Sequence, residues 1–356
     1  MVKNNRIVHI DALRGVAVLL MVMVHAAATW NPFDAAAGPS LLALIVSGLG
    51  GLAAPLFVTL FGWGMHHRTL TWAQRWGFAG FFIICQLIVN ASAPHLFELF
   101  TPGVLSLFAL LTLTQPWWAA PWHSKQPAFH QWAWFTGALL LLYVLLTPFR
   151  GPSQWDARVE AGSVAVVLSH LVLTGTYPLV PWVAFAAMGT MIAASEAPEV
   201  SRQNTLRLTL VGFLISIVIL FESLRTGAVW ALPTGDATLT FFPANIPFLI
   251  AATTGVGLCW LLAEERWRWS LLADLGRCSL TVYVAHFLPL VWLASLDEQH
   301  QWSLSTSSTV TMAYTLTWGW IGAMWYRKAS GWTLEAALRH LLRSAQKTNS
   351  GAEVEG

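Results

Sequence analysis

Long apolar stretches recur along the chain from near its first residues to about residue 326. A helix that crosses the hydrocarbon core of a bilayer needs about 20 predominantly apolar residues. Windows of that length predict ten transmembrane helices, at 12–29, 41–65, 74–92, 103–120, 131–148, 177–195, 207–224, 243–263, 277–296 and 308–326. The fold class that this pattern predicts is all-α, a polytopic membrane helical bundle.

Composition agrees with this pattern. Hydrophobic residues make up 56% of the chain and charged residues only 10%, whereas soluble domains have about 45–50% apolar and about 25% charged residues. Lysine and arginine stand singly at predicted helix ends and form no stripe, so no nucleic-acid partner is expected. Cys85, Cys259 and Cys278 lack the spacing of metal ligands and are interpreted as buried thiols, with no metal expected.

The distribution of positive charge predicts how the bundle is oriented. If the N-terminus is cytoplasmic and the ten helices alternate, 16 of the 19 lysines and arginines fall on the cytoplasmic side. Only Arg150, Arg158 and Arg225 fall outside, in agreement with the positive-inside rule. Both termini are therefore predicted to be cytoplasmic, with a transmembrane domain at 1–344 and a disordered polar tail at 345–356.

The first predicted helix is the most informative segment. Its apolar run follows basic residues, as in a signal peptide, but the charges at its start and the many later spans indicate a retained transmembrane helix. Arg14 and His25 are eleven positions apart, about three helical turns, so they share a face and stand about 16 Å apart along the axis. Asp11 lies one turn before Arg14 and can pair with it. Two interpretations stay open: a functional polar stripe, or an interfacial anchor with a snorkelling histidine.

Further ionisable residues fall at predicted helix ends or within the membrane. His286 comes nine positions after Arg277 and falls near mid-membrane, where it is either an acid–base or substrate-positioning group or a packed, hydrogen-bonded histidine. Arg68 follows two histidines at a cytoplasmic helix end and can bind phosphates or lipid headgroups. On the outer side, His95 and Asn245 are candidates for acceptor binding, with an ordinary solvated role as the alternative.

The segment Ile10–Gly15, taken together with His25, resembles the opening helix of enzymes in the transmembrane acyltransferase superfamily. In its acyltransferase-3 branch, an arginine and a histidine at the separation of Arg14 and His25 mark the active site. In its heparan-alpha-glucosaminide N-acetyltransferase branch, the Asp, Arg and Gly of this segment recur, an asparagine aligns with His25, and the catalytic histidine lies further on. The resemblance therefore allows His25 to correspond to either feature.

Other stretches resemble bacterial relatives of the heparan enzyme. They follow the same order over nearly the whole chain, at Ala54–Phe57, Thr101–Leu105, Tyr177–Trp182, Phe242–Pro247, Leu275–Tyr283 and Gly331–Glu335. Each motif is short, and their common order is what makes the resemblance specific.

The resemblance implies a multi-pass acyltransferase of the bacterial cytoplasmic (inner) membrane. Such an enzyme would move an acyl group, expected to be acetyl, from cytoplasmic acyl-CoA to an amino-sugar, glycan or other envelope acceptor on the outer side. A histidine would act as general base or as nucleophile. The residues expected to take part are, for catalysis, His25, Arg14 and Asp11; for the donor phosphates, Arg14, Arg68 and Arg277; and for the acceptor, His286, His95 and Asn245.

Two other functions fit the same polar stripe. A multi-pass transporter or flippase would use it as a path for a small polar or lipid-linked substrate. A non-catalytic membrane partner in envelope assembly would need neither Arg14 nor His25. The partners expected for the enzyme are acyl-CoA, the outer acceptor and the lipid bilayer, and small residues on many helix faces leave a homodimer open.

Overall fold

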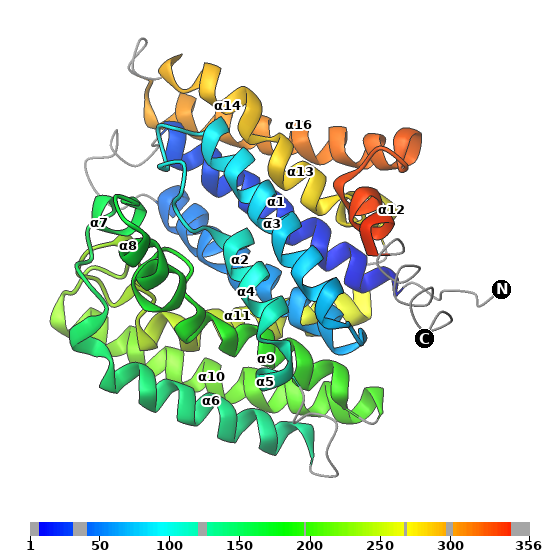
Figure 1. Cartoon of the computed structure of the whole chain (residues 1–356). Coiled ribbons are helices and arrows are strands. Elements are labelled where there is room, and N and C mark those ends of the chain that lie inside the picture. The colour runs from blue at the N-terminus through cyan, green and yellow to red at the C-terminus, as the bar shows by residue number, and fades with distance from the viewer. Residues whose placement is uncertain are drawn as a thin grey trace, which may run out of the picture.

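The computed structural model describes residues 7–30, 41–119, 127–195, 197–266, 269–296 and 302–342, and of 41–48 and 265–266 it describes the backbone alone. The predicted polar tail at 345–356 lies outside these residues. The described chain is mostly helical, and its long helices lie side by side in one bundle (Figure 1).

The helices and strands are as follows. The long helices are α1 (Val8–Trp30), α2 (Leu41–His66), α3 (Trp72–Ser92), α6 (Ala128–Leu145), α9 (Leu179–Ala194), α10 (Pro198–Thr226), α11 (Ile246–Arg266) and α16 (Leu304–Ala329). The shorter ones are α4 (Val104–Leu113), α5 (Gln115–Trp118), η2 (Thr147–Phe149), α7 (Asp156–Val159), α8 (Val164–Ser169), η3 (His170–Thr174), α12 (Ser270–Gly276), α13 (Ser279–Ala285) and α14 (Phe287–Leu293). Strand β1 (Ala231–Thr234) pairs in parallel with β2 (Leu239–Phe242), with Ala231 opposite Leu239 and Thr234 opposite Phe242.

Helix α1 is central to the packing of the bundle. It packs against α2, α12 and α16, and α2 packs in turn against α9. Helices α6 and α10 lie at one edge of the bundle and α16 at the opposite edge, with α1 and α2 between them (Figure 1). Any residue on the inward face of α1 is therefore surrounded by protein.

Six described helices are long and apolar enough to cross a membrane, and eight if each of two bent helix pairs counts as one span. Apolar side chains of α10 such as Val211, Leu214, Val218 and Phe221 are exposed, as expected for a face that contacts lipid. The chain is thus a helical, multi-pass membrane protein. The other two predicted spans correspond to α4 with α5, which is short, and to α16, which is long but rich in serine and threonine.

One predicted span differs in detail from the observed structure. The window 277–296 predicts a single helix, but the chain there consists of α13 and α14, which meet at His286, and α12 precedes them with a bend of 69° between Ser270–Gly276 and Ser279–Leu293. A Cβ atom on Gly276 would lie 1.8 Å from the backbone oxygen of Asp11. The break therefore lies where α12 meets the backbone of α1, a contact that only glycine permits.

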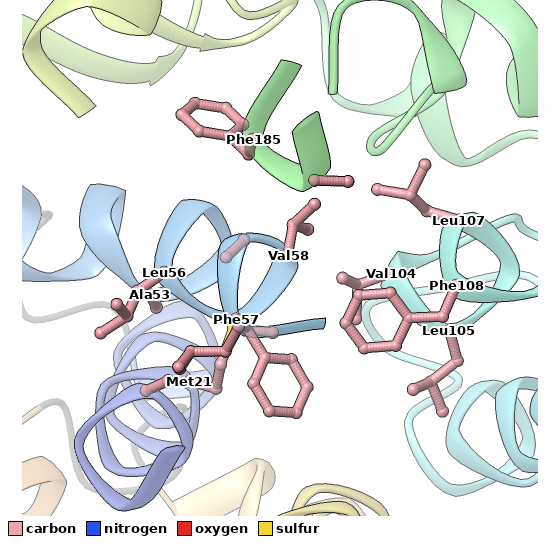
Figure 2. Close-up of a cluster of buried hydrophobic side chains, with 14 of the residues drawn as sticks. Met21, Ala53, Leu56, Phe57, Val58, Val104, Leu105, Leu107, Phe108 and Phe185 are labelled. Carbon is pink, nitrogen blue, oxygen red and sulfur yellow. The ribbon is translucent and has the colours of Figure 1, made fainter. Parts of the chain in front are cut away.

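The core fills the space between α1, α2, α4 and α9. Figure 2 shows Met21 of α1 beside Phe57 of α2, with Phe108 of α4 near Phe57 and Phe185 of α9 on the other side of α2. Backbones also meet directly, because a Cβ atom on Gly189 of α9 would lie 1.9 Å from the backbone oxygen of Thr59. Membrane helices associate through such close packing, since lipid tails are as apolar as the side chains.

Local signals set several helix ends. Helix α3 begins at a capping box, in which the Thr71 hydroxyl accepts from the Gln74 amide and the Gln74 side chain accepts from the Thr71 amide. Helix α10 begins with Pro198 in its first turn and ends before Gly227, whose φ of 68° lies in the left-handed region. These signals place the connecting loops at the two ends of the bundle.

Candidate active site

Two histidines predicted as separate candidates meet inside the bundle. The Nδ1 atom of His25 on α1 lies 3.0 Å from the Nε2 atom of His286, which is 261 positions away and lies between α13 and α14. Their rings stack with centroids 5.1 Å apart and planes 14° apart. His25 is 7% exposed and His286 0%. The chain therefore builds a buried histidine pair from its first helix and its broken penultimate segment.

Aromatic rings surround this pair. Phe287 lies 4.5 Å from the His25 ring and 4.2 Å from the His286 ring, measured between centroids. Tyr283 contacts both histidines at 5.9 Å, and Phe57 of α2 packs on Tyr283 at 6.2 Å. Polar groups in such surroundings interact more strongly than in water because the local dielectric constant is low.

The backbone around His286 is also held in place. The ring Nδ1 atom of His286 lies 3.1 Å from the backbone oxygen of Val282, one turn earlier in α13. The hydroxyl of Tyr314 on α16 donates to the backbone oxygen of His286. Both the ring and the main chain of His286 are thus fixed by neighbours on two helices.

His95 lies close to this pair on the exposed side. The Thr29 hydroxyl donates to the backbone oxygen of His25 at 2.9 Å, and the Thr29 Oγ1 atom lies 3.1 Å from Nε2 of His95. Because the Thr29 hydroxyl proton forms the bond to the His25 backbone oxygen, Nε2 of His95 must be the donor in the bond to the Thr29 oxygen. His95 is exposed. An exposed imidazole is therefore linked through one hydroxyl to the turn that carries the buried His25.

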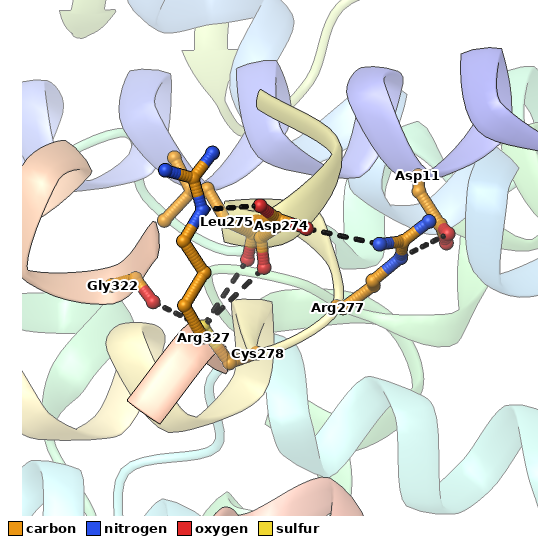
Figure 3. Close-up of polar contacts among 7 residues, drawn as sticks. All are labelled: Asp11, Asp274, Leu275, Arg277, Cys278, Gly322 and Arg327. Carbon is orange, nitrogen blue, oxygen red and sulfur yellow. Dashed lines mark hydrogen bonds and ion pairs between the residues drawn. The ribbon is translucent and has the colours of Figure 1, made fainter. Parts of the chain in front are cut away.

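Charged side chains join α1, α12 and α16 about three to four turns from His25 (Figure 3). Asp11 accepts from Arg14 at 3.4 Å and from Arg277 at 2.9 Å. Asp274 accepts from Arg277 at 2.9 Å and from Arg327 at 2.7 Å. The predicted pairing of Asp11 with Arg14 is confirmed, and the shorter contact of Asp11 is with Arg277. These carboxylates alternate with arginines from three helices and tie them together.

A second group of arginines carries positive charge at the same end of the bundle. Loss of hydration, followed by the positive charges of Arg14 and Arg339, lowers the pKa of the Arg68 guanidinium. Arg14 and Arg339 therefore both lie near Arg68, and we call these three residues the arginine cluster. Like charges brought together in this way favour an anionic ligand between them. Of the three residues predicted for donor phosphates, two belong to this cluster, whereas Arg277 binds two carboxylates.

Asn245 is placed elsewhere, at the start of α11. Its side-chain oxygen accepts from the Phe248 amide at 2.9 Å, and its Nδ2 atom donates to the backbone oxygens of Thr238 at 3.0 Å and Ala237 at 3.4 Å. These bonds cap the helix and fasten the loop that contains β2. Its predicted contact with an acceptor stays a prediction.

Several residues around the site were not predicted from the sequence as site residues. They are Thr29, Phe57, Asp274, Tyr283, Phe287, Arg327 and Arg339. Tyr283 lies three positions before His286, which places both on one helical face and is a usable signal. Asp274, three positions before Arg277, gives the same kind of signal, whereas the contact of Arg277 with Asp11 gives none, because Asp11 is 266 positions away.

The geometry offers two chemical elements within one bundle. A buried pair of imidazoles can accept and release a proton, and an arginine cluster toward the other end of α1 can bind an anion.

Comparison with known proteins indicates the class of reaction that these groups serve. No curated protein matches the chain. Residues 7–324, which include both histidines and Arg14, match the acyltransferase-3 family, described as an acyltransferase domain. The chain therefore belongs to the acyltransferase-3 family.

Proposed function

We propose that this membrane acyltransferase moves an acyl group, preferentially acetyl, from cytoplasmic acyl-CoA to an amino-sugar, glycan or other envelope acceptor on the outer side of a bacterial inner membrane. The observation that carries the proposal is the buried pair of His25 and His286. His25 lies on the same helix as Arg14 and about 16 Å from it along the axis. A kinship with bacterial relatives of heparan-alpha-glucosaminide N-acetyltransferase belongs to the same proposal.

The donor would bind with its phosphates on the arginine cluster. Guanidinium groups bind phosphate through paired hydrogen bonds, and Arg14, Arg68 and Arg339 concentrate positive charge at one end of the bundle. The long pantetheine arm of CoA separates the phosphates from the thioester. It would run along α1 and bring the thioester to the aromatic region around His25. This orientation requires the arginine end to be cytoplasmic, in agreement with the positive-inside prediction.

His25 would act as general base in the transfer. As the acceptor oxygen or nitrogen forms a bond with the thioester carbonyl carbon, it gives its proton to the imidazole. The carbon–sulfur bond then breaks, and the departing thiolate of CoA takes the proton from the imidazole. In the alternative, nucleophilic course the imidazole itself attacks the thioester and carries the acyl group before the acceptor receives it. The two courses differ in whether an acyl-enzyme forms.

The acceptor would approach from the end at which His95 lies. His95 is exposed, and one Thr29 hydroxyl separates it from the backbone of His25. An exposed histidine linked to a buried one provides polar contacts for an incoming hydroxyl or amine. Asp11 would have no chemical step and would orient Arg14 by the ion pair between them.

The test is acetyl transfer by purified protein in lipid nanodiscs, given acetyl-CoA with a labelled acetyl group and glucosamine as acceptor. Label is expected on the amino sugar with wild type and is lost in His25→Ala, which still binds acetyl-CoA. His130→Ala is the matched control, because His130 is exposed on α6, and it is expected to transfer normally. Full transfer by a folded His25→Ala protein would contradict the proposed role. Movement of a solute across proteoliposomes without thioester cleavage would favour the transporter or flippase instead.

A further inference from the structure

The protonation of the His286 ring follows from its partners. Its Nδ1 atom lies 3.1 Å from the backbone oxygen of Val282. A carbonyl oxygen can only accept, so the proton of this hydrogen bond must be on Nδ1. A neutral imidazole that carries its proton on Nδ1 has an unprotonated Nε2 atom. His286 therefore presents a hydrogen-bond acceptor at Nε2.

The protonation of the His25 ring follows in turn. Its Nδ1 atom lies 3.0 Å from Nε2 of His286. Because His286 Nε2 is the acceptor, His25 Nδ1 must be the donor. Neutral His25 then has its proton on Nδ1 and a lone pair on Nε2. Among the described residues none hydrogen-bonds to this Nε2 atom.

Neighbours keep the His286 ring in this orientation. Turning the ring over would place carbon atoms against the Val282 oxygen and against His25, and both hydrogen bonds would be lost in a site that is fully buried. Phe287 packs on one side of His286, and the Tyr314 hydroxyl binds its backbone oxygen. The orientation is therefore fixed by two hydrogen bonds and by packing.

We propose that His286 is a positioning residue that holds His25 with its proton on Nδ1, so that Nε2 of His25 is the nitrogen that reacts. This inference rests on the proposed acyl transfer. Nε2 takes the proton of the acceptor hydroxyl or amine while the acceptor atom bonds to the thioester carbon. After the carbon–sulfur bond breaks, the proton passes from Nε2 to the CoA thiolate. The Nδ1–H group of His25 donates to His286 throughout. His286 thus takes the place that the orienting carboxylate has in hydrolase triads, where it accepts from Nδ1–H of the catalytic histidine.

Two substitutions of His286 separate this role from simple packing. In His286→Gln the amide reaches the position of Nε2 and can accept from His25. In His286→Asn the shorter amide reaches only the position of Nδ1, so it keeps the contact with Val282 but offers nothing to His25. Glutamine and asparagine thus differ in the one interaction that the proposal needs.

Kinetics of acetyl transfer to glucosamine give the first readout. The His286→Asn protein is expected to have a kcat about a hundredfold below wild type, within the range that general-base catalysis contributes, with the KM for acetyl-CoA unchanged. The His286→Gln protein is expected to retain at least about tenfold more activity than His286→Asn. Equal activity of the two variants, at equal melting temperature, would overturn the proposal.

Nitrogen NMR gives a readout that does not depend on activity. Protein with ¹⁵N-labelled histidine rings is reconstituted in lipid at about pH 8, where an unperturbed imidazole is neutral. The His25 signals are identified by their loss in His25→Gln. A protonated Nδ1 and an unprotonated Nε2 are expected in wild type, with part of the proton moving to Nε2 in His286→Asn. A protonated Nε2 in wild type would refute the inference. If no acyl transfer is found, the proposed function fails, while this spectrum still decides the protonation.

Discussion

The Nε atom of Arg277 lies 2.9 Å from the Oδ2 atom of Asp11, although the two residues are 266 positions apart. The same guanidinium reaches Asp274 through Nη1, also at 2.9 Å. One guanidinium thus bridges two carboxylates where α12 contacts α1 through Gly276. This arrangement favours a role for Arg277 in holding the broken segment against α1, and so in placing His286 beside His25, over a role in binding phosphate.

The substitution Arg277→Gln is therefore expected to reduce stability more than donor binding. It leaves Asp11 and Asp274, which are largely buried, with one charged partner fewer each. Loss of hydrogen bonds to charged groups of this kind costs about 2 kcal/mol. Thermal unfolding in nanodiscs should show a lower melting temperature, whereas a labelled acetyl-CoA binding assay should give an unchanged Kd.

The control is Arg225→Gln on α10. Arg225 also pairs with an acidic residue three positions away, Glu222, but both side chains are largely exposed. Exposed ion pairs contribute little because water screens them, so the melting temperature should not change. If Arg277→Gln weakens acetyl-CoA binding without lowering the melting temperature, Arg277 binds the donor, as the sequence predicted.

The contact of Gly276 with α1 gives a second prediction. A Cβ atom at this position would lie 1.8 Å from the Asp11 oxygen, so Gly276→Ala must force α12 away from α1. We expect a loss of about 3 kcal/mol, the upper part of the usual range for overpacking, together with loss of acyl transfer. Gly80→Ala on α3 is the matched control, because a Cβ atom there meets nothing within 4 Å. Equal melting temperatures of the two variants would contradict the prediction.

The sequence predicts most of the long helices and the ionisable residues of α1 well, for a physical reason. Apolar windows of membrane length are long and unambiguous, and ionisable residues within them stand out because they are expensive to bury there. Asp11, Arg14, His25 and His286 were found in this way. Helix periodicity also predicted correctly that Asp11 pairs with Arg14.

What the sequence could not predict depends on contacts between distant segments. The break after Gly276 arises from an approach of α12 to the backbone of α1, which no periodicity records. Likewise, Arg277 near a helix end looks the same in sequence whether it binds a phosphate or the carboxylates of Asp11 and Asp274.

The arginine cluster gives a third prediction. Removing one guanidinium from a phosphate contact, in Arg68→Ala or Arg339→Ala, should weaken acetyl-CoA binding by about tenfold, as expected for loss of a charge-assisted hydrogen bond. Acetyl-pantetheine lacks the nucleotide and its phosphates, so its Kd should not change. Titration calorimetry with both ligands makes the comparison. An equal loss of affinity for the two ligands would place these arginines outside the phosphate site.

The buried carboxyl group of Glu335 predicts how stability depends on pH. Glu335 lies in the helical segment 334–342 after α16 and accepts from the Leu280 and Thr281 amides and the Thr281 hydroxyl. Burial raises its pKa above the usual 4.5, and these hydrogen bonds oppose the shift. Since the folded pKa is raised, the stabilising contribution is complete below pH 4.5 and is lost as the pH rises through the folded pKa.

The melting temperature should therefore fall as the pH rises from 4.5 through the raised pKa of Glu335. In Glu335→Gln this part of the slope should disappear, because the amide does not titrate. The unfolding of both proteins is followed across that pH range in the same lipid. Parallel curves for wild type and variant would mean that Glu335 has an ordinary pKa in the folded protein.

The Thr29 hydroxyl provides the last prediction, which concerns the acceptor. Thr29→Val keeps the shape of the side chain but removes the bonds to the backbone of His25 and to His95. With each of the two net hydrogen bonds contributing about 1 kcal/mol, the KM for glucosamine should rise by about thirtyfold, while the Kd for acetyl-CoA should not change. Thr309→Val on α16, whose exposed hydroxyl donates to the backbone oxygen of Ser305 in its own helix, should change neither value.

A double substitution tests whether Thr29 and His95 act as one unit. The Thr29 hydroxyl links the backbone of the buried His25 to the His95 imidazole. If this link is what matters, His95→Ala alone should raise the KM for glucosamine as Thr29→Val does. The double variant should then be no worse than either single one, because residues in one hydrogen-bonded network are not additive. Fully additive losses would mean that the two side chains contact the acceptor separately, and that the observed bond between them has no part in acceptor binding.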